Sequence, residues 1–231
     1  KISKRSNAMA FKPSFDPNTG RIKTLVRLSF FKGFIKTASF ENGALKYRTN
    51  GLIYKNTDEG KANIKVVNEG IKHFMGSASG WPGKDPLKFK EALGDGPKGR
   101  WPLYDGDKYV NDDGDVREGY VDTRYLKLTN DKKIKYRDRR GNEIDDEEVR
   151  DELFQSGHWA IAYWHLFGIK IQKKGGNGMF ATCDALQFFK RDDVFAGGGI
   201  SDDEIDDYGD DEDDDDLGGG SSKGDDDDLD L

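Results

Sequence analysis

Aromatic and basic residues alternate closely at several places along the chain, and this combination can do specific chemistry. Lys46, Tyr47 and Arg48 are consecutive, and Arg100 directly precedes Trp101. Cationic side chains neutralise phosphate groups, while exposed rings stack on bases for about 1–3 kcal/mol each. The pattern is therefore typical of a surface that holds a single-stranded nucleic acid, although any one ring can instead belong to the core.

One ring stands apart from the expected strands. Trp81 lies within Gly80-Trp81-Pro82-Gly83, where glycine and proline predict a loop, so we expect this ring to be exposed and free to stack on a base. The full set of candidate nucleic-acid-binding residues is Arg27, Lys46, Tyr47, Arg48, Tyr54, Trp81, Lys84, Lys88, Lys90, Lys98, Arg100, Trp101, Tyr125, Lys127, Arg139 and Arg140.

Two other motifs have the spacing of nucleotide- or calcium-binding loops, but each lacks a feature that such a site needs. Residues 94–99 have the spacing G-x-G-x-x-G, but Pro97 and the residues after it leave no room for the helix that would hold a pyrophosphate. The acidic run at residues 111–115 would place Tyr109 and Tyr120 at the two end positions of a calcium loop, where carboxylates are needed. Dispersed acidic residues leave a Mg²⁺-dependent nuclease or recombination enzyme open as an alternative.

The histidines and the cysteine predict neither catalysis nor a metal site. His73, His158 and His165 have no zinc-like spacing with Cys183, and no serine or cysteine pairs recognisably with a base. We therefore expect a non-enzymatic protein without cofactor or metal. A single cysteine suits a reducing cytoplasm, and no apolar run reaches the roughly 18 residues that a membrane helix needs.

The net charge of −7 averages two opposite regions. Residues 201–231 contain 17 acidic residues and one lysine, a net charge of −16, so residues 1–200 carry +9. Residues 1–8 precede Met9 and are expected to be a cloning remnant; without their three cations the body carries +6. A basic body favours a polyanionic partner, and the tail resembles such a partner in charge.

We expect residues 200–231 to be a disordered acidic tail, because this segment has too few apolar residues to offset the entropy of ordering. Residues 9–199 then form the folded domain. The tail closes with apolar residues among its acids, which predicts a partner-binding segment. Its residues are Asp225, Asp226, Asp227, Asp228, Leu229, Asp230 and Leu231.

Alternating and periodic apolar residues predict the elements that must position these side chains. Residues 58–75 have helical periodicity, Gly51 suggests a bulge, and turns are expected at Lys32-Gly33 and Asn42-Gly43. Residues 158–171 are apolar or aromatic on both faces, as in a strand covered on each side. The predicted strands are residues 24–31, 34–40, 45–55, 125–129, 134–137, 158–171 and 180–190, with a short helix at 145–154, which together favour a small closed or part-closed β-barrel.

Several short motifs, in order, resemble the single-stranded DNA-binding proteins of tailed bacteriophages, a family formerly described as a phage domain of unknown function. These motifs are Pro102-Leu103-Tyr104-Asp105-Gly106-Asp107, Gly119-Tyr120, Tyr125-Leu126-Lys127-Leu128, Ser156-Gly157, Gly176-Asn177-Gly178 and Ala185-Leu186-Gln187-Phe188. The resemblance implies an oligonucleotide/oligosaccharide-binding (OB) fold, here an OB-fold-like five-stranded barrel with an inserted helix and long loops.

The resemblance further implies sequence-independent binding of single-stranded DNA in phage replication or recombination, in the cytoplasm of the infected host. Similar proteins use acidic tails to recruit replication proteins, and their tails often end in an aromatic residue, whereas this one ends in Leu-Asp-Leu. We expect the tail to compete with DNA for the basic groove, so that duplex DNA binds once it is removed. An acidic decoy that binds basic proteins is a further alternative, and it predicts no DNA binding by the isolated body.

Overall fold

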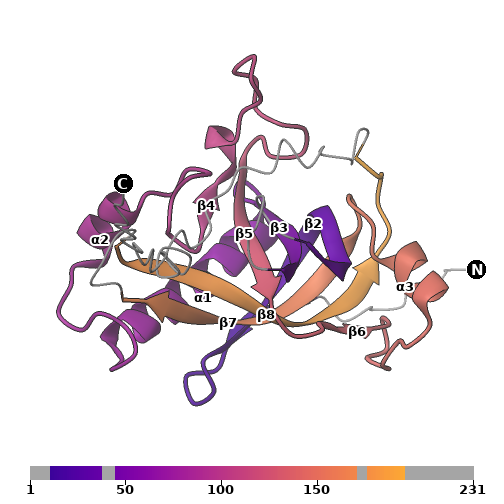
Figure 1. Ribbon diagram of the computed structural model, residues 1–231, viewed down its shortest axis with the longest axis horizontal. Helices are drawn as coiled ribbons and strands as arrows, with labels where there is room; N and C mark the ends of the chain where they lie inside the picture. The colour runs from indigo at the N-terminus through magenta and orange to yellow at the C-terminus, as the bar shows by residue number, and fades with distance from the viewer. Residues whose placement is uncertain (1–10, 38–44, 171–175, 196–231) are drawn as a thin grey trace, which may run out of the picture.

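The computed structural model describes residues 11–37, 45–170 and 176–195, which form a mainly β fold with three α-helices (Figure 1). In chain order the elements are β1 (Ser14–Phe15), β2 (Arg21–Thr37), β3 (Lys46–Tyr54), α1 (Asp58–Gly76), α2 (Pro86–Leu93), β4 (Tyr104–Asp105), the 3-10 helix η1 (Gly106–Lys108), β5 (Thr123–Asn130), β6 (Lys135–Arg137), α3 (Glu147–Leu153), β7 (Trp159–Ile169) and β8 (Gly178–Lys190). The mainly β class expected from the sequence is confirmed.

Five of the strands pair in a ring. β2 pairs antiparallel with β3 on one side and β7 on the other, β3 pairs with β5, and β7 pairs with β8. The ring closes where β5 and β8 run parallel, with Leu128 beside Ala181 and Thr129 beside Thr182. β1, β4 and β6 add short edges to this sheet. Five strands curling into a partly open barrel is the design of the OB fold.

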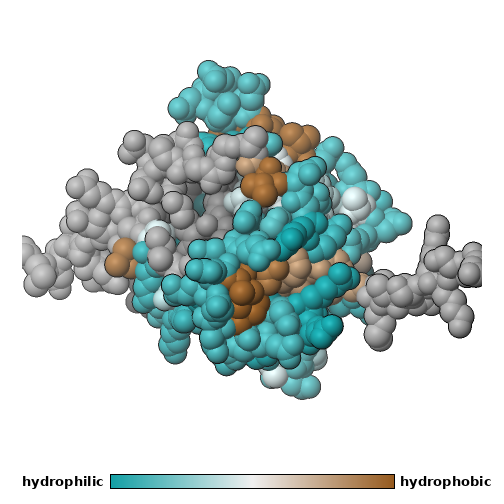
Figure 2. Space-filling model, turned by 90° about the vertical axis from the view of Figure 1, so that its right-hand side faces the viewer, coloured by the Kyte–Doolittle hydropathy of each residue, from teal (hydrophilic) through white to brown (hydrophobic). Residues whose placement is uncertain are grey.

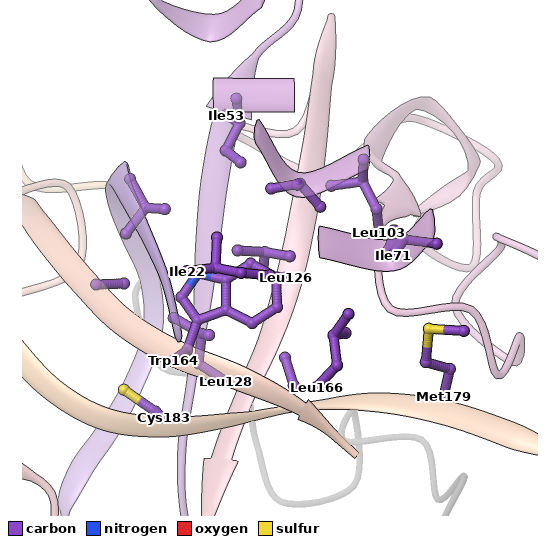
Figure 3. Close-up of a cluster of buried hydrophobic side chains, with 14 of the residues drawn as sticks. Ile22, Ile53, Ile71, Leu103, Leu126, Leu128, Trp164, Leu166, Met179 and Cys183 are labelled. Carbon is purple, nitrogen blue, oxygen red and sulfur yellow. The ribbon is translucent and has the colours of Figure 1, made fainter. Parts of the chain in front are cut away.

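Alternate side chains of the strands fill the inside of the ring. Leu126 and Leu128 of β5 are fully buried there, and Trp164 lies close to both and to Ile22 (Figure 3). The indole Nε1 of Trp164 donates a hydrogen bond to Thr24 Oγ1 at 3.0 Å. The indole of Trp164 is therefore buried with its polar atom satisfied.

β3 is regular at Gly51, so the bulge expected there is wrong. A Cβ atom at this position would lie 3.0 Å from the Cβ of Val26, and glycine is present because Val26 occupies that space. The register of β2 against β3 shifts instead at two places, between Ser29 and Lys32 and between Lys32 and Thr37 of β2. β2 runs without a break from Arg21 to Thr37, so the turn expected at Lys32-Gly33, between the predicted strands 24–31 and 34–40, is wrong.

α1 forms where the sequence predicts a helix. The Thr57 side chain accepts a hydrogen bond from the N–H of Gly60 at 3.0 Å and caps the first turn. Ile71, in the apolar stripe, is buried in the main core. The side-chain oxygen of Asn63 accepts a hydrogen bond from the N–H of Leu25 at 2.9 Å. The side chain of Asn63 in α1 thus satisfies a backbone N–H of β2 at a position where β2 is not paired with β3.

Residues 76–102, which include the loop predicted around Trp81, contain α2. The carboxylate of Asp85 caps this helix by accepting the N–H of Lys88 at 2.9 Å, and Pro86 occupies its first turn. Phe89 of α2 packs on Trp81 with ring centroids 4.7 Å apart. The segment is therefore packed against the body. The turn expected at Asn42-Gly43 lies outside the described residues.

A second apolar cluster covers one end of the outer face of β3 and β5. Leu52, Tyr104, Tyr120 and Tyr125 are all buried in it, and the rings of Tyr104 and Tyr125 stack at 5.0 Å. The covering residues come from the connection between α2 and β5, which includes β4 and η1. The rest of that outer face is not covered by this cluster.

Candidate nucleic-acid interface

The open part of the outer face carries a regular array of side chains. Lys127, between two buried leucines of β5, points outward and is opposite Asn50 of β3. The parallel pairing of β5 with β8 places Phe180 next to Lys127, and Phe180 is opposite Phe167 of β7. We call the result the outer rows, one made of Asn50, Lys127, Phe180 and Phe167 and the other of Arg48, Thr129, Thr182 and His165.

Two partly exposed rings meet in the first row. The centroids of Phe167 and Phe180 lie 5.4 Å apart, with an interplanar angle of 31°. The guanidinium of Arg100 lies 5.5 Å from the Phe180 ring, and the carbonyl of Arg100 accepts the N–H of Met179 at 2.9 Å. A Cβ at Gly178 would come within 2.5 Å of the Phe180 ring, so the absence of a side chain there lets this ring and Arg100 pack together.

Basic side chains flank these rings within the outer rows. Lys127 Nζ donates to the carbonyl of Pro97 at 2.9 Å and lies 4.9 Å from the ring of Tyr104. Arg48 is partly exposed and its Nε donates to the carbonyl of Thr37 at 3.1 Å. Rings and cations therefore lie close together over a few strands, which is the chemistry that stacked bases and phosphates require.

A buried carboxylate holds the segment that borders the outer rows. Asp95 contacts Lys108, Lys90 at 2.9 Å and Arg124 at 3.5 Å, which come from η1, α2 and β5. Burial raises the pKa of Asp95, but the hydrogen bonds from Lys108 and Lys90 outweigh burial and lower it overall. Arg124 also contacts Asp105 at 2.9 Å. This network fixes residues 94–101 beside β5.

Comparison with known proteins identifies the family. The profile described as "Enterobacter phage Enc34, ssDNA-binding protein" matches residues 20–217. The chain belongs to this Enc34 family. A relative, protein p50 of Acyrthosiphon pisum secondary endosymbiont phage 1, is 31% identical over 176 residues, which cover 76% of this chain and 86% of p50.

Solved structures from the same family share the fold. The single-stranded DNA-binding protein of bacteriophage Enc34 in complex with ssDNA has a TM-score of 0.61 at 18% identity, covering 82% of this chain and 100% of that one. Its C-terminal truncation has a TM-score of 0.57 at 17% identity, covering 77% and 90%. The OB-fold-like class implied by the sequence resemblance is thereby confirmed.

Within this Enc34-family fold, the expectation of an exposed Trp81 ring is wrong. Trp81 is only 7% exposed, and its ring packs between Phe74 and Phe89. The turn before it is tight, because a Cβ at Gly80 would lie 1.9 Å from the carbonyl oxygen of Phe74. The glycines that suggested a loop thus allow the chain to fold Trp81 back onto α1 and β7. A Cβ at Gly168 would approach its ring to 2.8 Å.

Two further aromatic candidates are also buried. Trp101 is 5% exposed within the main core, and Tyr125 is fully buried in the second cluster. Tyr125 does point outward from β5, as its alternation with Leu126 predicts, but Tyr104 and Tyr120 cover it. Both rings therefore belong to apolar clusters, which the sequence left open for any single ring; for Tyr125, strand periodicity does not reveal the segment that covers it.

Arg27 and Tyr54 contact each other, and Arg27 also contacts residues 193–195 at the C-terminal end of the described residues. The guanidinium of Arg27 donates to the carbonyls of Gly157 and Asp193, both at 2.8 Å, and to the hydroxyl of Tyr54 at 3.0 Å. It also lies 4.3 Å from the ring of Phe195. These contacts assign Arg27 a structural role that its place in a basic and aromatic sequence did not reveal.

The remaining candidates lie at the surface in separate places. Lys90 is tied to Asp95. Arg139 and Arg140 are exposed in the turn after β6. Lys46 and Tyr47 are partly exposed at the start of β3, whereas Lys84, Lys88 and Lys98 are exposed around α2. The tail residues 225–231 lie outside the described part of the chain.

Sequence reasoning missed Phe167, Phe180 and His165 as surface residues. Residues 158–171 were expected to be covered on both faces, but Trp164 points inward while His165 and Phe167 are partly exposed. The expectation of two covered faces is wrong, because the outer face of β7 carries aromatic residues without a covering layer. The alternate spacing of residues 163, 165 and 167 was the available signal.

His165 forms a charged contact in the second outer row. Its Nδ1 lies 3.1 Å from a carboxylate oxygen of Asp184, and this hydrogen bond raises the pKa of His165. Arg21 approaches the same carboxylate at 3.9 Å. Two basic side chains therefore lie beside this carboxylate, which reduces its repulsion of a phosphate.

The acidic residues that raised a metal alternative have cationic neighbours. Lys55 contacts Asp107 and lies 3.8 Å from Asp105. Across residues 11–37, 45–170 and 176–195, no three His, Cys, Asp or Glu side chains gather as a metal site. In the same part of the chain, no helix combines the length and apolar character needed to cross a membrane.

Proposed function

We propose that this protein binds single-stranded DNA without sequence preference and coats it during phage DNA replication or recombination, in the cytoplasm of the infected host. The observation that carries the proposal is the partly exposed pair Phe167–Phe180 flanked by Lys127 and Arg100. Membership of the Enc34 family supports it, as does the likeness to a structure described as a complex with ssDNA.

The outer rows have the groups for this binding mode. Bases stack on Phe167 and Phe180, while Lys127, Arg48 and Arg100 neutralise the phosphates. Every base offers a ring face to a phenyl side chain, so such contacts discriminate little between sequences. A duplex keeps its ring faces inside the base stack, which leaves only its phosphates for this surface.

The test is a salt titration with a fluorescent oligo(dT) strand read by anisotropy. The logarithm of affinity should fall linearly with the logarithm of salt concentration, with a slope of about −0.7 per phosphate neutralised. Phe180→Ala should weaken binding by about 5- to 150-fold, the equivalent of one base that no longer stacks on a ring. The control is Phe15→Ala, which removes a partly exposed ring that packs on His73.

The proposed interface would be overturned if the affinity for the oligo(dT) strand did not depend on salt concentration, or if Phe180→Ala bound this strand as tightly as the parent protein. Incubation of the labelled strand with protein and Mg²⁺ tests the nuclease alternative in the same tube. We expect the strand to remain intact, and a Mg²⁺-dependent loss of length would replace the binding proposal with an enzymatic one.

We further propose that the acidic tail competes with DNA for the outer rows and recruits replication or recombination proteins through residues 225–231. The support is charge: residues 201–231 carry −16 and are tethered to a basic body by a Gly-containing segment, so their effective concentration at that body is high. Single-stranded DNA adds stacking to its charge and displaces the tail, whereas duplex DNA has charge alone.

Truncation after Gly199 tests the tail. Affinity for single-stranded DNA should rise, and affinity for duplex DNA should rise by a larger factor. Both gains should shrink with added salt, because screening weakens tail and phosphate contacts alike. Unchanged affinities at low salt would contradict competition and leave partner recruitment as the tail's role.

A further inference from the structure

The aromatic surface continues along β7 and β8 beyond the outer rows. These two strands run together along the length of the molecule (Figure 1). Tyr163 lies two residues before His165 on the outer side of β7, and Phe189 lies on the outer side of β8 near its end; both are partly exposed. Neither residue is among the candidates predicted from the sequence, and the outer rows do not include them. We call Tyr163, Gln187 and Phe189 the distal strip.

Each ring of the distal strip has its own cation. Lys23 Nζ, on the neighbouring β2, lies 5.8 Å from the centroid of the Tyr163 ring. The guanidinium of Arg139 lies 5.7 Å from the centroid of Phe189. The ring of Phe11 lies 5.4 Å from Lys23 Nζ and 6.3 Å from the Phe189 ring, so a third aromatic side chain borders the same surface.

Hydrogen bonds fix the strip relative to the basic turn after β6. The hydroxyl of Tyr163 donates to the side-chain oxygen of Gln187 at 2.8 Å, and Gln187 Nε2 donates to the carbonyl of Arg139 at 3.2 Å. Within the turn, the carboxylate of Asp138 accepts the N–H of Arg140 at 2.8 Å. The backbone that carries Arg139 and Arg140 is therefore held beside the rings while both side chains remain exposed.

The spacing of these rings suits an unstacked strand. Outward residues on a β-strand recur every ~6.6 Å, whereas the bases of a regular stacked strand rise by about 3.4 Å. Bases stacked on successive rings of β7 must therefore separate from one another. A single strand can extend in this way, but a duplex cannot do so without losing its base stacking.

We propose that the distal strip is a second binding segment for single-stranded DNA and is continuous with the outer rows. The DNA strand runs along it in an extended form. This inference rests on the proposed DNA binding. Lys23, Arg139 and Arg140 neutralise its phosphates, and the rings of Tyr163 and Phe189 stack on its bases. Figure 2 shows the side of the molecule that lies on the right in Figure 1, where a mostly hydrophilic surface surrounds a few hydrophobic areas.

The experiment compares a short oligo(dT) strand, long enough only for the outer rows, with a strand several nucleotides longer. Arg139→Ala/Arg140→Ala should leave the short strand unaffected and should reduce the salt slope for the long strand by about 1.4, which is 0.7 for each phosphate that is no longer neutralised. The matched control is Lys132→Ala/Lys133→Ala, which also removes two exposed cations but lies off the strip.

Ring variants complete the test. Tyr163→Ala/Phe189→Ala removes two stacking rings and should weaken binding of the long strand by about 30-fold or more, while binding of the short strand stays unchanged. Circular dichroism first checks that the variant is folded. If the long strand binds these variants and the arginine variants as tightly as the parent, the distal strip is overturned while Phe180→Ala still reports on the outer rows. If the parent binds neither strand, the proposed function itself fails.

Discussion

Trp81 offers the sharpest test of the reasoning, because the sequence and the structure predict opposite results for the same substitution. An exposed loop ring would contribute affinity and little stability. In the structure Trp81 is 7% exposed and contacts Phe74 and Phe89, so Trp81→Ala leaves a cavity in the core. Substitutions of this size cost about 3–5 kcal/mol. At roughly 2–4 °C per kcal/mol for a domain of 150–250 residues, Tm should fall by about 6–20 °C.

The same substitution should weaken DNA binding indirectly. The indole packs against the backbone of β7 at Gly168, and nearby Lys170 Nζ donates to the carbonyl of Ala78 at 3.0 Å. Loss of the ring therefore loosens the end of β7 that presents Phe167. Thermal unfolding followed by circular dichroism gives the stability, and anisotropy well below the Tm gives the affinity. Trp81→Phe, which keeps most of the apolar volume, should show a smaller loss of both.

A Tm within about 2 °C of the parent, together with reduced affinity, would refute the buried placement and restore the stacking role expected from the sequence. That shift corresponds to less than about 1 kcal/mol, too little for a deleted core tryptophan. Equal Tm values for Trp81→Ala and Trp81→Phe would contradict the cavity argument as well.

Three other substitutions test separate parts of the structure. Gly51→Ala should destabilise by about 1–3 kcal/mol in urea unfolding, because its Cβ would meet Val26 at 3.0 Å; an unchanged midpoint would contradict the tight packing. Asp95→Asn should lower Tm at neutral pH. The folded pKa of Asp95 lies below its usual 3.8, so the difference should persist above that pH and vanish as pH falls through the folded value; a pH-independent difference would argue against ion pairing. His165→Gln should destabilise below about pH 6.5 and approach the parent as pH rises through the raised folded pKa, and the opposite trend would exclude the contact with Asp184.

Local patterns in the sequence were enough to predict most elements. Helical periodicity at residues 58–75 placed α1, and alternation at residues 24–31 placed a strand within what the structure shows as β2. Such features depend on neighbours a few residues away, which a single sequence displays directly. The family resemblance added the OB-fold-like class, which periodicity alone left as a generic barrel.

The candidate site was predicted less well, because exposure depends on what covers a residue from elsewhere in the chain. Tyr125 points outward as expected, yet Tyr104 and Tyr120 cover it from a segment without strong periodicity. Trp81 sits among loop-forming residues that in fact make a tight, buried turn. Phe167 was overlooked because an apolar residue on the uncovered face of a strand looks the same in sequence as one in the core.

The ring of strands closes through a very short parallel contact, the pairs Leu128–Ala181 and Thr129–Thr182. These partners are more than fifty residues apart in sequence, so their pairing carries a larger loop-closure cost than the neighbouring hairpin of β7 and β8. This parallel pairing of β5 with β8 is therefore expected to form late in folding and to open first by local unfolding. Both outer rows cross it, since Lys127 and Thr129 lie on one side and Phe180 and Thr182 on the other. A DNA strand bound to both rows would contact β5 and β8 together and stabilise their pairing. Amide hydrogen exchange along β5 and β8 should therefore slow when DNA binds.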